Sequence, residues 1–120
     1  MFKAVFLAKR RPGMTFDDFM NYYETNHSKL GVKVLPKAKR YFRRYLRPVA
    51  TALGEPSAEA EYDVITECWF EDKATFESTM VAIAEPDTIA MLAEDEMKFI
   101  DRSKNRMMIV EEHESKLPNA

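Results

Sequence analysis

The chain has 120 residues, a length typical of one domain with one hydrophobic core. Hydrophobic residues make up 46% of it and charged residues 32%, a composition that excludes intrinsic disorder. The formal net charge of −2 argues against a nucleic-acid-binding protein, because phosphate neutralisation normally requires a clear excess of Lys and Arg.

Membrane and secreted classes are also disfavoured. The longest apolar run, from Ala4 to Ala8, is far shorter than the roughly 20 residues of a membrane-spanning helix. The first residues lack the long apolar core of a signal peptide, and Cys68 is the single cysteine, so no intramolecular disulfide can form. We therefore expect a cytoplasmic protein in a reducing compartment, with no membrane partner.

The first half of the chain predicts a strand, a helix and a second strand. Apolar residues dominate from Phe2 to Lys9, which predicts the first strand. Thr15 can cap a helix whose apolar residues recur at steps of three and four, and Gly31 is its expected end. The aromatic segment from Lys39 to Val49 predicts the second strand.

The second half predicts a strand, a broken helix and a last strand. Residues 51–61 show no sustained apolar period and predict a surface loop, whereas residues 62–70 favour a strand. Asp72 is expected to cap a helix that Pro86 divides into two pieces. Residues 105–112, with four consecutive apolar side chains, predict the fourth strand.

This order of elements is that of the ferredoxin-like βαββαβ unit, an α+β fold with a four-stranded antiparallel sheet and both helices on one face. Apolar residues occupy both faces of the first strand, with Phe2 and Phe6 on one side and Val5 and Leu7 on the other. A sheet with one solvated face would alternate instead. A symmetric dimer that packs two sheets face to face would bury the second surface, so we expect a dimeric α+β barrel.

Charge predicts one way to hold such a dimer together. Arg43, Arg44 and Arg47 lie in or beside the second strand, whereas Glu111 and Glu112 belong to an acidic group near the C-terminus. If the basic strand lay beside the acidic strand of a partner, complementary charge would fix the register of the dimer and make it sensitive to salt. The alternative is a solvated basic edge.

Several segments of the chain are similar to the signatures of a known family. They are KRRPGMT at 9–15, leading into a helix that ends in YETNH at 23–27, then YD at 62–63, ECWF at 67–70 and DEMKFID at 95–101. Together these segments resemble the EthD family. One difference follows the histidine, where the family often has a small residue and then Pro and Leu, but this chain has Ser28, Lys29 and Leu30.

The resemblance implies an EthD-like dimeric α+β barrel domain over residues 1–113, with 114–120 as a flexible C-terminal tail. It also implies a ligand pocket between the sheet and the helices. Members of the family include proteins linked to ether degradation, and fungal dehydratases and decarboxylases that act on aromatic or polycyclic polyketides without a cofactor. A homodimer that needs no cofactor is therefore expected.

Two residues are the candidates for proton transfer. His27 lies on the apolar stripe of the first helix near its end, where a helix dipole and a neighbouring carboxylate can tune an imidazole. Glu67 stands between apolar neighbours, and burial inside a barrel would raise the pKa of its carboxyl. Each also has a structural interpretation, His27 as a packed helix-end residue and Glu67 as the partner of an Arg.

The remaining candidates are expected to bind the substrate. They are Tyr23, Tyr45, Trp69, Asp95 and Phe99. Asp95 has capping or solvation as an alternative role. No metal site is expected, because the two histidines, at positions 27 and 113, are far apart in the sequence and neither belongs to a compact ligand cluster.

Three functions remain open from the sequence. The first is a lyase, a dehydratase, decarboxylase or cyclase, that acts on a small hydrophobic, aromatic or polyketide-like compound with His27 as general acid or base. The second is a cofactor-independent oxidoreductase or monooxygenase of phenols or quinols, which oxygen uptake would reveal. The third is a non-catalytic protein that binds a hydrophobic metabolite, for which an apolar pocket without a titrating pair would be diagnostic.

Overall fold

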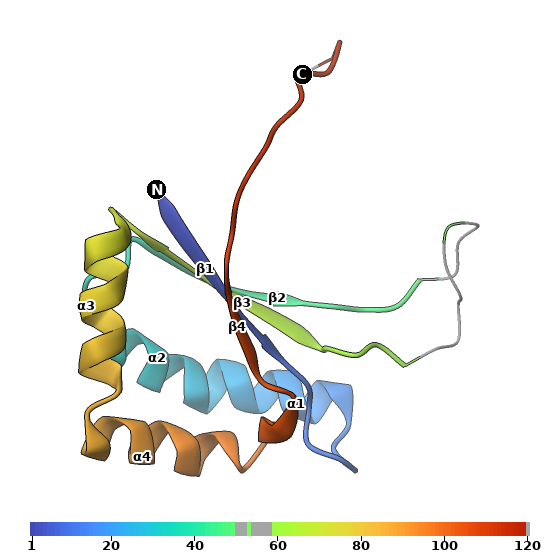
Figure 1. Ribbon diagram of the computed structural model, residues 1–120. Coiled ribbons are helices and arrows are strands. Elements are labelled where there is room, and N and C mark those ends of the chain that lie inside the picture. The colour runs from blue at the N-terminus through green and yellow to red at the C-terminus, as the bar shows by residue number, and fades with distance from the viewer. Residues whose placement is uncertain (50–52, 54–58, 120) are drawn as a thin grey trace.

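The computed structural model describes residues 1–49, 53 and 59–119, so most of the loop expected at 51–61 lies outside the described residues. Four strands, four α-helices, a π-helical turn and a 3-10 turn make up these segments (Figure 1). In chain order they are β1 (Phe2–Ala8), α1 (Phe16–Tyr22), the π-helical turn (Tyr23–His27), α2 (Ser28–Val34), β2 (Arg40–Tyr45), β3 (Val64–Phe70), α3 (Lys73–Ile83), α4 (Pro86–Glu96), the 3-10 turn (Arg102–Lys104) and β4 (Arg106–Ile109).

The strands form one antiparallel sheet in the order β2-β3-β1-β4, with Phe6 opposite Thr66 in the central pair. The helices all lie on one side of this sheet (Figure 1). The predicted α+β, ferredoxin-like fold is therefore confirmed. Within the described part of the chain, no helix is long and apolar enough to cross a membrane.

Capping residues set the helix starts as the sequence predicts. Thr15 Oγ1 accepts a hydrogen bond of 3.1 Å from the Asp18 backbone N–H, and Asp72 Oδ1 accepts one of 2.8 Å from that of Thr75. Pro86 divides the last helical region because it stands at the first turn of α4, where its missing N–H costs no hydrogen bond.

The first helix differs from its prediction in two ways. It widens into a π-helical turn at Tyr23–His27, and it continues past Gly31 to Val34. Gly31 is buried beneath the Tyr41 side chain, and a Cβ there would lie 2.7 Å from Tyr41 Cζ. The glycine therefore permits a close approach of β2 rather than ending the helix.

The hydrophobic core lies between the helices and the sheet. Its buried members are Ala8, Phe19, Tyr23, Val64, Phe99 and Ile100. The ring centroids of Phe19 and Phe99 are 5.6 Å apart, so the first helix packs directly against the segment that follows α4. This contact brings the end of the first helix and α4 together.

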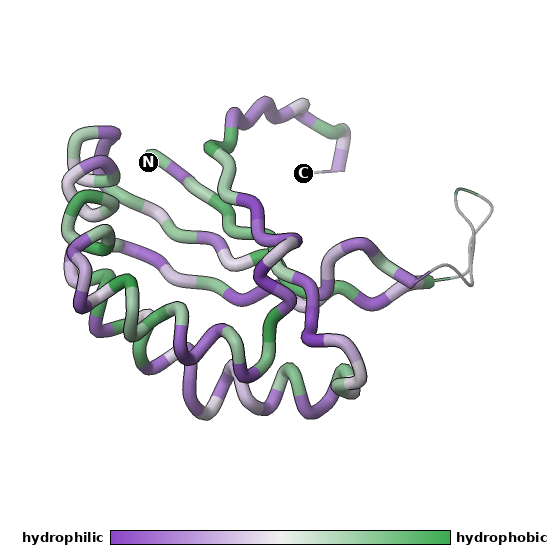
Figure 2. The backbone as a smooth tube through the Cα atoms, turned by 60° about the horizontal axis from the view of Figure 1, so that its bottom comes forward, coloured by the Kyte–Doolittle hydropathy of each residue, from purple (hydrophilic) through white to green (hydrophobic). Residues whose placement is uncertain are grey.

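The opposite side of the sheet, here named the open face, is covered by no helix of the described residues. Because side chains alternate along a strand, it carries Val5, Leu7, Ile65, Glu67, Trp69 and Met108. The sheet thus carries apolar residues on both of its faces, as the sequence predicts. After β4 the C-terminal segment leaves the sheet and runs away from the helices, and it is mostly hydrophilic (Figures 1 and 2).

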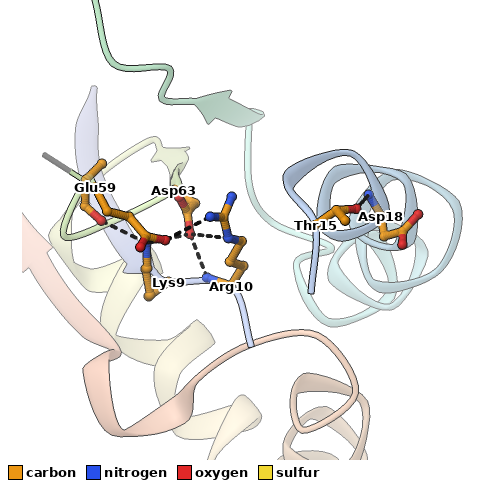
Figure 3. A network of polar contacts seen from close by, with 7 residues as sticks. Lys9, Arg10, Thr15, Asp18, Glu59 and Asp63 are labelled. Carbon is orange, nitrogen blue, oxygen red and sulfur yellow. Dashed lines mark hydrogen bonds and ion pairs between the residues drawn. The ribbon is translucent and has the colours of Figure 1, made fainter. Parts of the chain in front are cut away.

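A polar network joins the end of β1 to the segment before β3 (Figure 3). The buried Asp63 carboxylate accepts a hydrogen bond of 2.9 Å from the Arg10 backbone N–H, and Lys9 Nζ lies 3.4 Å from it. Glu59 in turn accepts from Lys9 and Arg10 at 2.9 and 2.8 Å. The buried carboxylate is thereby compensated, and the turn that precedes α1 is fixed.

Glu24 clamps β2 to the π-helical turn. The Arg43 guanidinium donates to its two oxygens at 2.7 and 3.0 Å, and the Tyr45 hydroxyl donates at 2.5 Å. Arg44 and Arg47 also have acidic partners in the same protomer, at Glu67 and Asp17. The arginines of the basic strand therefore each have an acidic partner within the chain, and the expected pairing with an acidic strand of a partner stays a prediction.

The Glu24 clamp generates a prediction for stability against pH. Its hydrogen bonds from Arg43 lower the pKa of Glu24 below the ordinary value of 4.5, although partial burial opposes them. The stabilisation is then complete above pH 4.5 and is lost as the pH falls through the lower pKa of the folded state. Urea unfolding should show Glu24→Gln less stable than the wild type at neutral pH, with the difference shrinking below pH 4.5.

Glu77→Gln is the matched control, because Glu77 pairs with Lys73 at 3.7 Å on an exposed helix surface. It should change the free energy of unfolding little at any pH. A Glu24→Gln difference that stays constant down to pH 3 would contradict the clamp.

Candidate functional site

A cavity of about 190 Å³ lies between the helices and the sheet. Most of its wall is apolar, with Ala4, Phe6, Val34, Phe70, Phe76 and Leu92 among the residues that line it. This is the position that the sequence resemblance implies for a ligand pocket. Such a wall favours an apolar ligand, and a few polar groups would orient it.

The principal polar group in the wall is His27, at the end of the π-helical turn. The residue is 8% exposed, and its Nδ1 lies 2.8 Å from Oδ2 of Asp95, which α4 contributes and which is itself buried. The other Asp95 oxygen accepts from the Tyr22 hydroxyl at 2.6 Å. Among the described residues, Nε2 of His27 has no hydrogen-bond partner.

This arrangement decides which ring nitrogen of the neutral imidazole carries the proton. A carboxylate only accepts hydrogen bonds, so the neutral imidazole carries its proton on Nδ1 and presents the Nε2 lone pair. Phe99 packs against the ring with centroids 5.0 Å apart and restricts its rotation. The histidine is thus oriented in the way that suits a general base.

The carboxylate of Asp95 also affects Tyr22. Burial raises the pKa of the Tyr22 hydroxyl to about 12, and the hydrogen bond to Asp95 and its negative charge add to the rise. Tyr22 therefore remains a hydrogen-bond donor at physiological pH. The carboxylate has one donor on each oxygen, which compensates its burial between two helices.

The π-helical turn brings a second polar side chain to the cavity. Tyr23, at its first residue, lies with its ring centroid 5.4 Å from that of His27. Its hydroxyl is 2.5 Å from Thr66 Oγ1 on β3. Burial raises the pKa of Tyr23 well above its ordinary value, so the phenol stays protonated. Single π-helical turns of this kind occur frequently at functional sites.

Three further polar groups line the cavity: Tyr41 from β2, Cys68 from β3 and Glu96 from α4. Burial, with a contribution from the charge of Glu67, raises the pKa of the Cys68 thiol to about 11. A thiol with a raised pKa stays protonated near neutral pH and is therefore a poor nucleophile. Glu96 accepts a hydrogen bond of 3.0 Å from Asn105 Nδ2.

The residues proposed from the sequence fall into separate groups. His27 and Tyr23 line the cavity, and Asp95 and Phe99 contact the imidazole from behind. The alternative of capping or solvation is therefore wrong for Asp95, whose carboxylate is buried against Tyr22 and His27. Tyr45 packs edge-on against the Tyr23 ring and is not among the residues that line the cavity.

Glu67 and Trp69 lie on the open face, across the sheet from His27. The pairing register places Thr66 and Cys68 toward the helices, so Glu67 between them points the other way. Burial would raise the pKa of Glu67, but hydrogen bonds from Trp69 and Arg44 outweigh it and lower the pKa. The expected raised pKa is wrong for this protomer, and the sheet separates Glu67 from the His27 cavity.

The sequence did not indicate Tyr22, Tyr41, Thr66 or Glu96 as members of the site. Tyr22 and Glu96 stand directly beside two predicted residues, Tyr23 and Asp95, and helical spacing alone could not distinguish the neighbours. For Tyr41 the available signal was Gly31, because a glycine within a helix can mark the close approach of another side chain.

No group of three or more His, Cys, Asp or Glu side chains in the described segments is arranged to hold a metal ion. A second cavity, of about 560 Å³, is lined by residues 9–15 together with Glu59, Asp101 and Lys104. Its two most buried cations, Lys9 and Arg10, are already paired with Glu59 and Asp63 (Figure 3).

Known structures share this fold at low sequence identity. An ethyl tert-butyl ether (EthD) family protein from Bacillus halodurans matches with a TM-score of 0.62 and 20% identity, covering 94% of this chain and 100% of that one. The protein At3g17210 from Arabidopsis thaliana matches with a TM-score of 0.62 and 17% identity, covering 98% and 100%. HapK from Hahella chejuensis gives 0.59 and 16%, covering 98% and 97%.

No curated protein matches the chain in sequence. The family model described as the EthD domain, however, matches residues 11–103, a span that contains both His27 and Asp95. Because this match covers most of the chain, the protein belongs to the EthD family.

Proposed function

We propose that the cavity binds a small hydrophobic or aromatic compound and that His27 acts on it as a general acid and base in a cofactor-independent lyase reaction. The observation that carries the proposal is that His27, on the wall of a mostly apolar cavity, is paired at 2.8 Å with the buried Asp95 behind it. A base that is oriented by a carboxylate and shielded from water is the minimum that such chemistry needs.

The size of the cavity limits the ligand. An engineered apolar cavity of roughly 150 Å³ accommodates benzene, and this cavity measures about 190 Å³. One ring with a short substituent fits that space. We therefore propose that a single ring of the substrate occupies the cavity.

Dehydration of a β-hydroxy carbonyl compound is the reaction that fits these groups most simply. The Nε2 lone pair of His27 takes the proton from the carbon next to the carbonyl, and a carbon–carbon double bond forms as the β-carbon–oxygen bond breaks. The departing hydroxyl receives that proton from Nε2 and leaves as water. Asp95 stabilises the imidazolium in between, as a hydrogen-bonded carboxylate does for other catalytic histidines.

The titrating pair also weighs against the non-catalytic alternative. A protein that only stores or carries an apolar metabolite has no need of a buried imidazole–carboxylate pair, whose desolvation is costly. No contact in the described residues favours the oxidoreductase alternative over the lyase.

The role of His27 can be tested with small cyclic β-hydroxy ketones. The wild type is expected to convert 3-hydroxycyclohexanone to cyclohex-2-enone, followed by ultraviolet absorbance. His27→Gln should lower the rate by about 10²- to 10⁴-fold, the usual contribution of a general base. Asp95→Asn should lower it by about 10²-fold or more, because an amide no longer fixes the Nδ1–H tautomer.

His113→Gln is the matched control, since this second histidine is exposed in the C-terminal segment and contacts only Glu111. It should retain the wild-type rate. Equal rates for His27→Gln and His113→Gln would rule out the catalytic role. Ligand binding without turnover across a panel of such ketones would favour the binding protein instead.

We also propose that the protein is a homodimer in which two open faces pack together as an α+β barrel. Val5, Leu7 and Ile65 are only partly buried on this face in one protomer. At the sheet edge, β4 is exposed throughout, with Met107, Met108 and Ile109 each about half exposed. An exposed apolar edge strand beside an uncovered apolar sheet face favours association with a second copy.

The dimer can be disrupted by one charge on the open face. Ile65→Asp should place an uncompensated carboxylate in the interface and weaken the dimer by more than tenfold, measured by analytical ultracentrifugation. Val32→Asp, at a 65% exposed position on α2, should leave the dimer intact. Because the strand arginines already have partners in their own protomer, the affinity should vary little with salt. A monomeric wild type at micromolar concentration would contradict the proposal.

A further inference from the structure

Three hydroxyl groups from three elements meet at the cavity wall. Tyr23 comes from the π-helical turn, Tyr41 from β2 and Thr66 from β3, and all three line the cavity. The Tyr23 hydroxyl lies 2.5 Å from Thr66 Oγ1, and the phenols of Tyr23 and Tyr41 are close enough for each to affect the pKa of the other. The three groups thus form a chain in the order Tyr41, Tyr23, Thr66, here named the hydroxyl chain.

The hydroxyl chain has one proton more than it uses. Three hydroxyls carry three protons, and the contacts between them can use at most two. No backbone carbonyl of the described residues accepts from any of the three side chains. Burial raises the pKa of both Tyr23 and Tyr41, so neither phenol loses its proton near neutral pH. One hydroxyl proton is therefore available for an acceptor outside the chain.

The local packing holds the Tyr41 end of the chain in place. The Tyr41 hydroxyl lies directly over the Cα of Gly31 in α2, in space that any other side chain would fill. Gly31 is in the middle of a helix, where glycine is less favourable than alanine. The protein thus has a residue of low helix propensity at the position where the Tyr41 hydroxyl needs space beside the helix.

We propose that the hydroxyl chain, through Tyr41, donates a hydrogen bond to the carbonyl oxygen of the ligand, so that Tyr41 is the oxygen-binding residue of the cavity. This inference rests on the proposed function, because it concerns the same cavity. The Tyr23 ring adjoins His27, with 5.4 Å between the ring centroids. The oxygen-binding hydroxyls and the proposed base, His27, therefore line the same cavity. A carbonyl oxygen held there would be stabilised as negative charge develops on it.

Acetophenone and ethylbenzene form a matched pair of probes, because they share the ring and differ at the carbonyl. One neutral hydrogen bond to the ligand corresponds to about a three- to tenfold difference in affinity. Calorimetric titration should therefore show acetophenone binding to Tyr41→Phe three- to tenfold more weakly than to the wild type. Ethylbenzene should bind the two proteins equally.

Tyr45→Phe is the matched control. It removes a phenolic hydroxyl from the same strand and the same face, but that hydroxyl donates to Glu24, away from the cavity wall. Its affinity for acetophenone should equal that of the wild type. Thermal unfolding of each variant checks that the fold is intact.

Infrared spectroscopy of bound acetophenone reports the hydrogen bond in the wild type without any substitution. The carbonyl stretch should move to lower wavenumber on binding to the wild type and to Tyr45→Phe, and this shift should be absent or smaller in Tyr41→Phe. An unshifted carbonyl band in the wild type, or an equal loss of affinity for both probes in Tyr41→Phe, would overturn the inference while leaving the cavity as a binding site. Failure of both probes to bind the wild type would overturn the proposed function as well.

Discussion

The buried carboxylate of Asp95 is the interaction on which the arrangement of the site depends. It joins two helices that are far apart in the sequence, since one oxygen accepts from Tyr22 in α1 and the other faces His27 at the end of the π-helical turn. A buried carboxylate with one donor missing would be costly, so all three side chains have to come together when the helices pack. Packing of Phe99 against His27 and Phe19 then closes the core around this group.

The π-helical turn gives the site its second component. It displays Tyr23 and His27 on the side of the helix that faces the sheet, where the hydroxyls of Tyr41 and Thr66 complete the polar part of the cavity. Glu24 in the same turn is clamped by Arg43 and Tyr45 of β2. The turn is therefore held to β2 through Glu24 and to α4 through the contact of His27 with Asp95, which keeps base and donors in a fixed relation.

Much of the fold could be predicted from local chemistry. Thr15, Asp72 and Pro86 act at helix starts through the backbone next to them, so the sequence alone was sufficient for those boundaries. His27 and Tyr23 could be identified from the sequence because they lie on the same apolar stripe of the predicted helix. The face of the sheet on which Glu67 lies could not be predicted in this way. The direction of a side chain on β3 depends on the register of β3 with β1. The sequence pattern does not determine that register when both faces of the strands are apolar. Tyr41 and Gly31 meet only in the folded chain.

The orientation of His27 by Asp95 is the central claim, and nitrogen-15 NMR of the imidazole tests it most directly. At mildly alkaline pH the wild type should show a protonated Nδ1 and an unprotonated Nε2, and addition of acetophenone should perturb the Nε2 signal more than the Nδ1 signal. In Asp95→Asn the proton of the neutral imidazole should no longer favour Nδ1 over Nε2. A wild-type spectrum in which Nε2 carries the proton, unchanged by the ligand, would contradict the account.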